Sequence, residues 1–159
     1  NKIVKVEQVI HRDLWRKYYR FCQLLKNPNQ VWVKHGTGST DPELVCENGF
    51  NRSYSRPNTR TMWGQGIYTA ESAKYSDSYV RPTDGQTQKQ MLLCLFAAGK
   101  VYQPPPEEYC QTTECQRKEP PKGFDSVRGI VKQVGQDQDF ALISYQDNQI
   151  YPFYRVTYE

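Results

Sequence analysis

The apolar run at residues 91–102 is the segment that most constrains the fold. A continuous apolar run of this kind is typical of a buried strand, and Gly99 is expected to break it. Shorter runs that alternate or end at polar turns predict further strands at residues 2–10, 31–33, 66–70, 140–145 and 150–158. The chain is therefore expected to be organised around a sheet of several short strands.

Helices are expected to be few. From Asp13 onward the apolar residues follow a helical period, which predicts an amphipathic helix capped by Asp13 and ended at residues 27–29. Its apolar face is formed by Leu14, Tyr18, Phe21, Cys22 and Leu25. A short helix is predicted at residues 41–49, where Asp41 is the cap and Gly49 the stop. One or two helical turns are expected at residues 72–79.

The segment at residues 103–123 contains five prolines and is expected to lack regular structure. Many short strands with two or three helices indicate an α+β domain. We expect residues 1–159 to form a single domain, and the start without Met suggests that it is excised from a longer protein.

Charge does not point to bulk nucleic-acid binding. The net charge of +4 comes from 21 basic and 17 acidic residues, which are interspersed. Arg52, Arg56 and Arg60 form a modest basic loop that is either solvated or turned toward a phosphate. No apolar run approaches the ~18 residues of a membrane span, and no signal peptide is recognisable.

Five cysteines are present without a C-x-x-C pair, and neither histidine has metal-ligand spacing with them. A disulfide framework or zinc site is therefore not expected. Cys110 and Cys115 flank a polar loop and could pair, but thiols are expected. This cysteine usage favours a reducing compartment, so the protein is expected to be intracellular, either cytoplasmic or nuclear.

Two short motifs are rejected on context. His11-Arg12-Asp13-Leu14 imitates a protein-kinase catalytic loop, but the other kinase motifs are missing. Gly64-Gln65-Gly66 lacks the third glycine and the long preceding strand of a dinucleotide fold.

A three-part polar and aromatic constellation carries the chemistry. Lys34-His35-Gly36-Thr37 follows a short apolar strand, and a His-Gly step at a strand end exposes a peptide group beside an imidazole. The segment 63–70 with Ser76 and Tyr79 adds aromatic faces and a hydroxyl, and the segment 150–154 completes the set. Together they suit one flat ligand that bears an amide.

These motifs resemble the catalytic domain of the poly(ADP-ribose) polymerase superfamily. The resemblance rests on His35-Gly36-Thr37, Gly64-x-Gly66-Ile67-Tyr68-x-Ala70, Ser76, Tyr79, Phe124-Asp125-Ser126-Val127 and Tyr151-Pro152-x-Tyr154, in this order along nearly the whole chain. It implies an ADP-ribosyltransferase fold with two packed, mainly antiparallel sheets and a few flanking helices.

The resemblance also implies that NAD is the co-substrate and that no metal is needed. Gly36 would hold the nicotinamide carboxamide through its backbone, and Ser76 would bond the same amide. Tyr79 and Tyr68 would pack on the two sides of the nicotinamide ring. His35 would bond the adenosine ribose, and such positioning lowers the barrier to reaction. Thr37 belongs to the same cofactor-binding set.

Ile150 decides which reaction the resemblance implies. Chain-forming members of the family carry a Glu immediately before the Tyr of the last motif, and Ile150 stands there in this sequence. The catalytic set His35, Tyr68 and Ile150 is the pattern of mono-ADP-ribosyltransferases. Asp147 is expected in a turn or, on a strand, on the opposite side of the sheet, and Gln149 is also expected to face away.

The leading hypothesis is an NAD-dependent mono-ADP-ribosyltransferase, a glycosyltransferase of the pentosyltransferase type. It would move one ADP-ribose from NAD to protein side chains, with Glu or Asp favoured, and release nicotinamide. Its partners would be NAD and protein acceptors, including itself, with no membrane and no strong nucleic-acid signal.

Two other functions stay open. One is a catalytically silent module that binds NAD, ADP-ribose or a protein, although retention of the pocket residues argues against it. The other is modification of nucleic-acid ends, which the weak net charge does not support.

Overall fold

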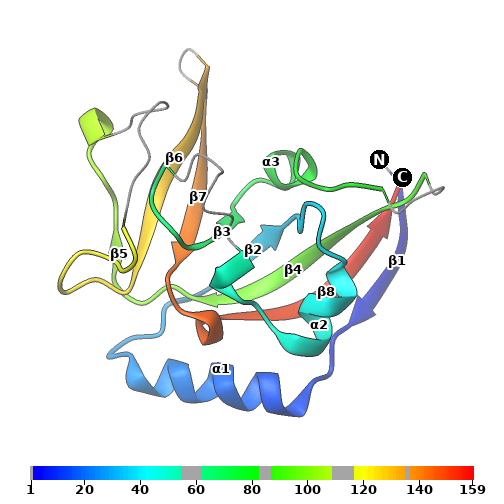
Figure 1. The fold of residues 1–159 in the computed structure, drawn as a ribbon, viewed down its shortest axis with the longest axis horizontal. Coiled ribbons are helices and arrows are strands. Elements are labelled where there is room, and N and C mark those ends of the chain that lie inside the picture. Colours follow the sequence, from blue (N-terminus) through cyan, green and yellow to red (C-terminus); the bar gives the residue numbers. More distant parts are fainter. Residues whose placement is uncertain (1, 55–61, 83–86, 109–116, 135–136) are drawn as a thin grey trace.

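The computed structural model describes residues 2–54, 62–82, 87–108, 117–134 and 137–159, and all structural statements concern these residues. The strands are β1 (Ile3–Gln8), β2 (Gln30–His35), β3 (Ile67–Ala70), β4 (Lys89–Ala97), β5 (Val101–Tyr102), β6 (Ser126–Val134), β7 (Asp137–Ser144) and β8 (Ile150–Tyr158). The α-helices are α1 (Arg12–Leu24), α2 (Pro42–Asn48) and α3 (Ala73–Asp77), with 3₁₀ turns η1 (Arg52–Tyr54), η2 (Pro106–Glu108) and η3 (Asp147–Gln149). Figure 1 shows this α+β arrangement.

The strands form one mixed sheet in the order β1-β8-β4-β2-β3-β7-β6-β5, in which only the β5–β6 pair is parallel. The expectation of two packed sheets is therefore wrong for the described residues. The two expected sheets are joined into one by a single register pair, Lys34 with Ala70, between β2 and β3. The half of the sheet formed by β1, β8, β4 and β2 runs in a different direction from the half formed by β3, β7, β6 and β5. Strands β6 and β7 therefore lie across the direction of β4 and β8 (Figure 1).

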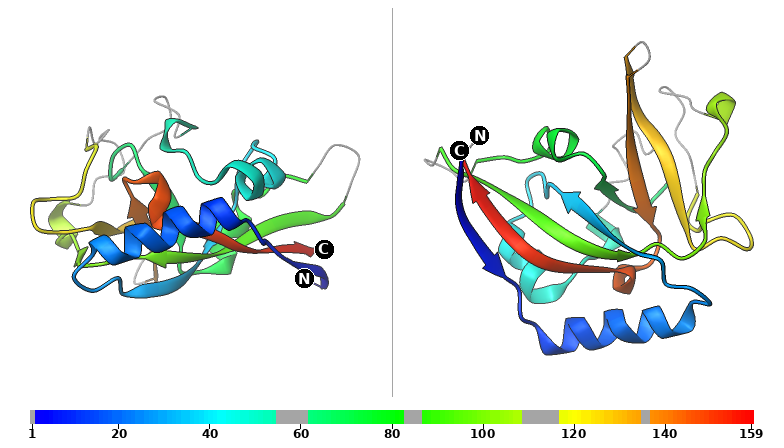
Figure 2. Two further views of the ribbon diagram at one scale, coloured as in Figure 1. Left: turned by 90° about the horizontal axis from the view of Figure 1, so that it is seen from below. Right: turned by 180° about the vertical axis from the view of Figure 1, so that it is seen from behind.

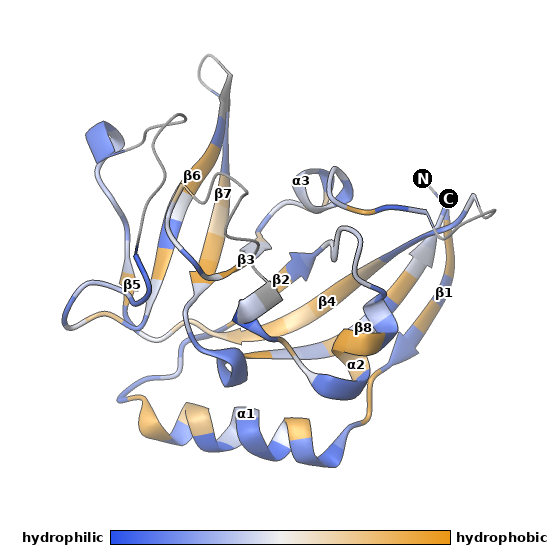
Figure 3. Cartoon of the chain, in the orientation of Figure 1, coloured by the Kyte–Doolittle hydropathy of each residue, from blue (hydrophilic) through white to orange (hydrophobic). Residues whose placement is uncertain are grey.

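Different helices pack on the two faces of the half formed by β1, β8, β4 and β2. On one face, α1 packs Tyr18 and Cys22 against Ala97 and Tyr151. On the other face, the core contains α2 residues together with Leu92, Phe96 and Ile150 of the sheet, as the alternation of strand side chains requires. Figure 2 shows α1 along one edge of the molecule, and Figure 3 shows hydrophobic and hydrophilic residues alternating along this helix.

Most helix signals in the sequence are confirmed, with one correction. Asp41 caps α2 by accepting a hydrogen bond from the Glu43 backbone N–H at 2.9 Å, and Gly49 ends this helix with a φ of 80°. The cap of α1, however, is His11 and not Asp13, because the His11 Nδ1 accepts from the Leu14 N–H at 3.3 Å. A histidine rarely serves as a cap, so propensity favoured the neighbouring aspartate.

Strand β6 was not predicted from the sequence. Gly129 interrupts its apolar pattern, and an interior glycine usually weakens a strand. The structure gives the reason for this glycine, because a Cβ at position 129 would overlap the indole of Trp63. Trp63 is 3% exposed and its Nε1 donates to the Ile130 carbonyl at 2.8 Å. The glycine in this strand is therefore explained by a tryptophan that lies far away in the sequence.

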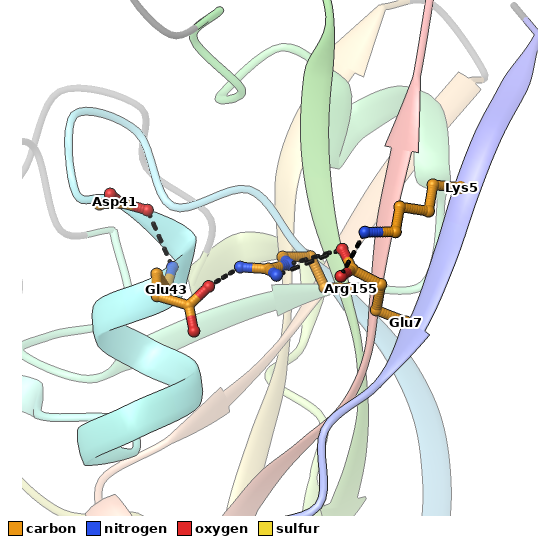
Figure 4. Close-up of polar contacts among 5 residues, drawn as sticks. All are labelled: Lys5, Glu7, Asp41, Glu43 and Arg155. Carbon is orange, nitrogen blue, oxygen red and sulfur yellow. Dashed lines mark hydrogen bonds and ion pairs between the residues drawn. The ribbon is translucent and has the colours of Figure 1, made fainter.

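A charged network ties α2 to the sheet (Figure 4). Arg155 of β8 pairs with Glu7 of β1 at 3.2 Å and with Glu43 of α2. Lys5 also donates to Glu7 at 2.7 Å, and hydrogen bonds from Lys5 and Arg155 hold the pKa of the Glu7 carboxyl below its usual value. The network fixes the position of α2 relative to β8.

Replacing Gln149 by leucine is expected to lower the free energy of unfolding by about 2–4 kcal/mol. The Gln149 side chain is fully buried; its Nε2 donates to the carbonyls of Ala97 (2.9 Å) and Asp125 (3.0 Å), and its Oε1 accepts from Ser144 Oγ at 2.7 Å. Leucine would leave all three partners without this bond in the core. Urea unfolding measures the loss. The exposed Gln23→Leu on α1 is the matched control, and an equal effect of the two changes would refute this role of Gln149.

Candidate functional site

All seven residues predicted for the site line one cavity of about 860 Å³. They are His35, Gly36, Thr37, Tyr68, Ser76, Tyr79 and Ile150. The cavity lies between the end of β2, strand β3, the helices α2 and α3, and the start of β8. Its volume is within the range typical of small-molecule sites.

His35 is held in one orientation at the end of β2. Its Nδ1 lies 2.8 Å from the Tyr68 carbonyl oxygen, and its ring meets the buried ring of Phe50 edge-on at 5.1 Å. Because a carbonyl only accepts hydrogen bonds, Nδ1 carries the proton. Burial lowers the pKa of His35, so the ring is neutral near pH 7 and its Nε2 is an acceptor.

Gly36 lies directly against α3. A Cβ at this position would overlap the Ser76 carbonyl oxygen and would come within 3.1 Å of Val80 Cγ2 and 3.2 Å of Tyr79 Cβ. From the sequence, Gly36 was expected to let the ligand approach the backbone closely. The structure gives a second reason, since only glycine lets β2 pass this close to α3.

Tyr68 connects the two sides of the cavity. Its hydroxyl donates to the Gly64 carbonyl at 2.9 Å and accepts from the Trp63 N–H at 3.0 Å, while its own carbonyl binds His35. The phenol is thus fixed at both ends. Its ring can offer an aromatic face without having to be ordered by the ligand.

Ser76 and Tyr79 lie on α3 and just after it, as the spacing predicted. Ser76 is 3% exposed, whereas Tyr79 is 48% exposed at the cavity. Tyr75 was missed, and it lies one helical turn before Tyr79. The two hydroxyl oxygens are 2.6 Å apart and the rings are 5.2 Å apart, so Tyr75 holds the Tyr79 ring in place. The i, i+4 spacing in the sequence was the available signal.

Thr37 lies in the cavity wall, but its hydroxyl has a partner within the loop. Its Oγ1 donates to the Thr40 carbonyl at 2.6 Å. The Thr37 proton is therefore used to shape the turn after His35, and only the oxygen lone pairs remain for a ligand.

Ile150 begins β8 and is 3% exposed in the cavity wall. Asp147 is in a 3₁₀ turn, as expected for the turn alternative, yet it also lines the cavity. Among the described residues of the cavity wall, Asp147 is the only carboxylate. Its Oδ1 accepts a hydrogen bond from the Arg52 N–H at 2.8 Å. Gln149 faces away, as predicted, and is bound within the core.

The basic side chains at the cavity differ from those expected. Lys17 of α1 and Arg81 after α3 line it, and neither was singled out in the sequence. Arg52 instead donates from its guanidinium to the Tyr145 carbonyl at 3.0 Å and the Lys118 carbonyl at 3.2 Å. Of the two roles left open for this loop, the phosphate-facing one therefore does not suit Arg52, while Arg56 and Arg60 lie outside the described residues.

The described residues contain free thiols but no metal-binding cluster. Cys22, Cys46 and Cys94 are buried free thiols, whereas Cys110 and Cys115 lie outside the described residues. Within the described ranges no cluster of three His, Cys, Asp or Glu side chains could hold a metal ion. None of the helices in those ranges is long and apolar enough to cross a membrane.

Comparisons with known proteins point to one family. The family model described as poly(ADP-ribose) polymerase catalytic domain matches residues 1–158. The human protein mono-ADP-ribosyltransferase PARP14 is 27% identical over 164 residues, which cover 99% of this chain and 9% of that protein. A probable poly(ADP-ribose) polymerase of Dictyostelium discoideum is 27% identical over 99% of this chain and 44% of its own length. Mouse mono-ADP-ribosyltransferase PARP10 is 36% identical over 51% of this chain and 9% of its own length.

Proposed function

Because the chain belongs to the family of poly(ADP-ribose) polymerase catalytic domains and is therefore an NAD ADP-ribosyltransferase, we propose that it transfers a single ADP-ribose to acidic protein side chains, its own included. The observation that carries the restriction to single transfer is Ile150. An aliphatic side chain that is 3% exposed occupies the cavity wall where a carboxylate would be needed to extend a chain.

The cavity suits NAD as substrate. Gly36 contributes backbone polar groups and Ser76 a hydroxyl at the same point of the wall, which matches a carboxamide that both donates and accepts. The Tyr68 and Tyr79 rings provide the aromatic faces for nicotinamide. The Nε2 of His35 accepts a hydrogen bond from a ribose hydroxyl. These contacts orient the bond that breaks.

The transfer itself needs few resident groups. The bond between the nicotinamide nitrogen and the ribose carbon breaks, and neutral nicotinamide leaves. An acceptor carboxylate attacks the developing oxocarbenium-like centre and forms the new carbon–oxygen bond. A carboxylate is already deprotonated at neutral pH, so no general base is required. A ribose hydroxyl acceptor would need such a base.

Asp147 is the residue that tests this mechanism within the chain. If the acceptor carboxylate supplies the nucleophile, Asp147→Asn should retain transfer within about threefold of wild type. Asp139→Asn is the matched control, because Asp139 is not part of the cavity wall but, after burial and the contact with Tyr79, contributes to raising the pKa of Tyr75. A loss of two orders of magnitude in transfer rate in Asp147→Asn alone would identify Asp147 as a resident base. This result would contradict the substrate-assisted mechanism.

The experiment for single transfer uses purified protein with labelled NAD, followed by mass spectrometry of the automodified chain. Single additions on Glu or Asp residues are expected, and ladders of polymer would overturn the proposal. Ile150→Ala is expected to keep the thermal shift caused by benzamide, because an apolar wall is retained. A benzamide shift without any transfer would instead support the silent binding module.

A further inference from the structure

The net charge of the protein is concentrated on one element. The segment from Arg12 to Lys26 contains five basic residues and one acidic residue, which account for the whole net charge of +4. The other 16 basic and 16 acidic residues cancel. This segment is α1 together with the two residues that follow it, and α1 lies along an edge of the molecule (Figure 2). The interspersed charge of the sequence is therefore uneven in space.

Three arginines of α1 form a stripe. Arg12, Arg16 and Arg20 are exposed and are spaced four residues apart, which places neighbouring side chains on one face at a rise of about 6 Å. Within the described residues, the single ion pair of the stripe is Arg16 with Asp13 at 3.4 Å, and both side chains are exposed. Such an exposed pair is weak and leaves the stripe able to bind an anion.

Exposed aromatic rings flank this stripe. Trp15 is 40% exposed and Tyr19 is 53% exposed, and the helical period places both beside the arginines. The band continues over the sheet, where Phe153 lies 6.3 Å from Trp15 and 5.3 Å from Trp32, measured between ring centroids. Trp32 is 48% exposed and stacks on Tyr154 at 6.1 Å.

The part of this band that lies over the sheet is on the side away from the cavity, and the α1 residues that line the cavity, Leu14 and Lys17, are not part of the band. Trp32 is flanked in β2 by Val31 and Val33, which belong to the core beneath the cavity. In β8, Ile150 and Pro152 line the cavity, whereas Tyr151 and Phe153 pack with α1. Successive strand residues point to opposite faces, so a ligand on the band does not compete with a ligand in the cavity.

We propose that the face formed by Arg12, Arg16, Arg20, Trp15, Tyr19 and Trp32 binds single-stranded nucleic acid. Cationic side chains follow a phosphate backbone, and exposed rings stack on unpaired bases. An acidic peptide would use the arginines but would gain nothing from half-exposed tryptophans. A duplex keeps its bases stacked on each other and also leaves the rings unused. This binding goes beyond the proposed transfer reaction and does not depend on it.

The first test measures the fluorescence anisotropy of a fluorescein-labelled oligouridylate of about 12 nucleotides. The triple variant R12Q/R16Q/R20Q is expected to bind at least tenfold more weakly at low salt. The slope of log K against log salt should fall in magnitude by about two, at about 0.7 per lost phosphate contact. The matched control K118Q/K122Q/K132Q removes the same charge from exposed lysines outside α1 and should change affinity less than threefold. Equal losses in the two triple variants would overturn the proposal.

The second test concerns the rings and leaves the charge unchanged. Tyr19→Ala and Trp32→Ala are each expected to weaken oligouridylate binding by about tenfold, which is typical of a lost base–aromatic stack. Urea unfolding verifies that each variant is folded. Replacing Tyr19, which is more than half exposed, is expected to disturb the fold less than replacing Trp32. Unchanged affinity in both variants, tighter binding of a polyglutamate peptide, or displacement of the oligonucleotide by benzamide would each contradict the proposal.

Discussion

Replacing Gly36 by alanine is expected to abolish ligand binding in the cavity and to lower the free energy of unfolding by about 2–3 kcal/mol. The new methyl group would overlap the Ser76 carbonyl oxygen, which belongs to the backbone of α3 and cannot rotate away. Helix α3 or the end of β2 must then shift. Either movement displaces Ser76 and Tyr79, which line the cavity beside Gly36. The absence of a benzamide thermal shift and a lower urea midpoint measure the two effects.

The control for this experiment is Gly38→Ala, two residues further along the chain. A Cβ at Gly38 has nothing within 4 Å, and only its φ of 66° disfavours alanine, at a cost of about 1 kcal/mol. Gly38→Ala should therefore keep the benzamide shift. Loss of binding in both variants would mean that backbone strain, rather than contact with α3, explains the effect of Gly36→Ala.

Replacing His35 by asparagine is expected to lower kcat/KM for transfer by about 100-fold while the protein stays folded. The asparagine amide can still donate to the Tyr68 carbonyl, which His35 Nδ1 now contacts at 2.8 Å. It has no equivalent of the Nε2 that we propose accepts from the ribose. The variant thus separates the structural hydrogen bond from the proposed ligand contact, and steady-state kinetics with labelled NAD report the difference.

Two comparisons sharpen this test. His35→Ala should lose the same activity and additionally lower the free energy of unfolding by about 1 kcal/mol, because the hydrogen bond from His35 to the Tyr68 carbonyl is removed. If His35→Asn transfers ADP-ribose at the wild-type rate, then His35 is a structural histidine and the proposed ribose contact is wrong.

The titration of His35 adds a pH dependence. Burial lowers the pKa of His35 below its ordinary value of 6.5, so the neutral form predominates at pH 7. NAD binding is therefore expected to be constant from about pH 7 to 8. It should weaken as pH falls through the lowered pKa of His35, because the protonated ring donates from both nitrogens. Protonation of the buried ring also lowers the free energy of unfolding, over the range below pH 6.5.

Local signals predicted much of the fold. Asp41, Pro42 and Gly49 defined α2, because caps and stops depend on the conformations of a few adjacent residues. The apolar run at residues 91–102 became β4 and β5 with a break at Gly99. Strand β6 escaped prediction, because Gly129 is explained only by the packing of Trp63.

Other features depended on distances between segments. The number of sheets rested on one register pair between β2 and β3, which no periodicity in either strand encodes. The carboxylate of Asp147 reaches the cavity wall because η3 turns the chain before β8 begins. Asp147 was expected to face away only if it lay on a strand, and it lies in the turn that was the other expectation.

Motif order and spacing in the sequence were enough to predict the members of the candidate site. His35, Gly36, Tyr68, Ser76, Tyr79 and Ile150 were singled out in this way, and they line one cavity, because each motif supplies particular residue types at a fixed spacing. How these residues are held became visible in the three-dimensional structure. The proton position on His35, the support of Tyr79 by Tyr75 and the close contact of Gly36 with α3 all arise where distant segments meet. The positive charge between Arg12 and Lys26 is contiguous in the sequence, and folding adds the rings of Phe153 and Trp32 beside it.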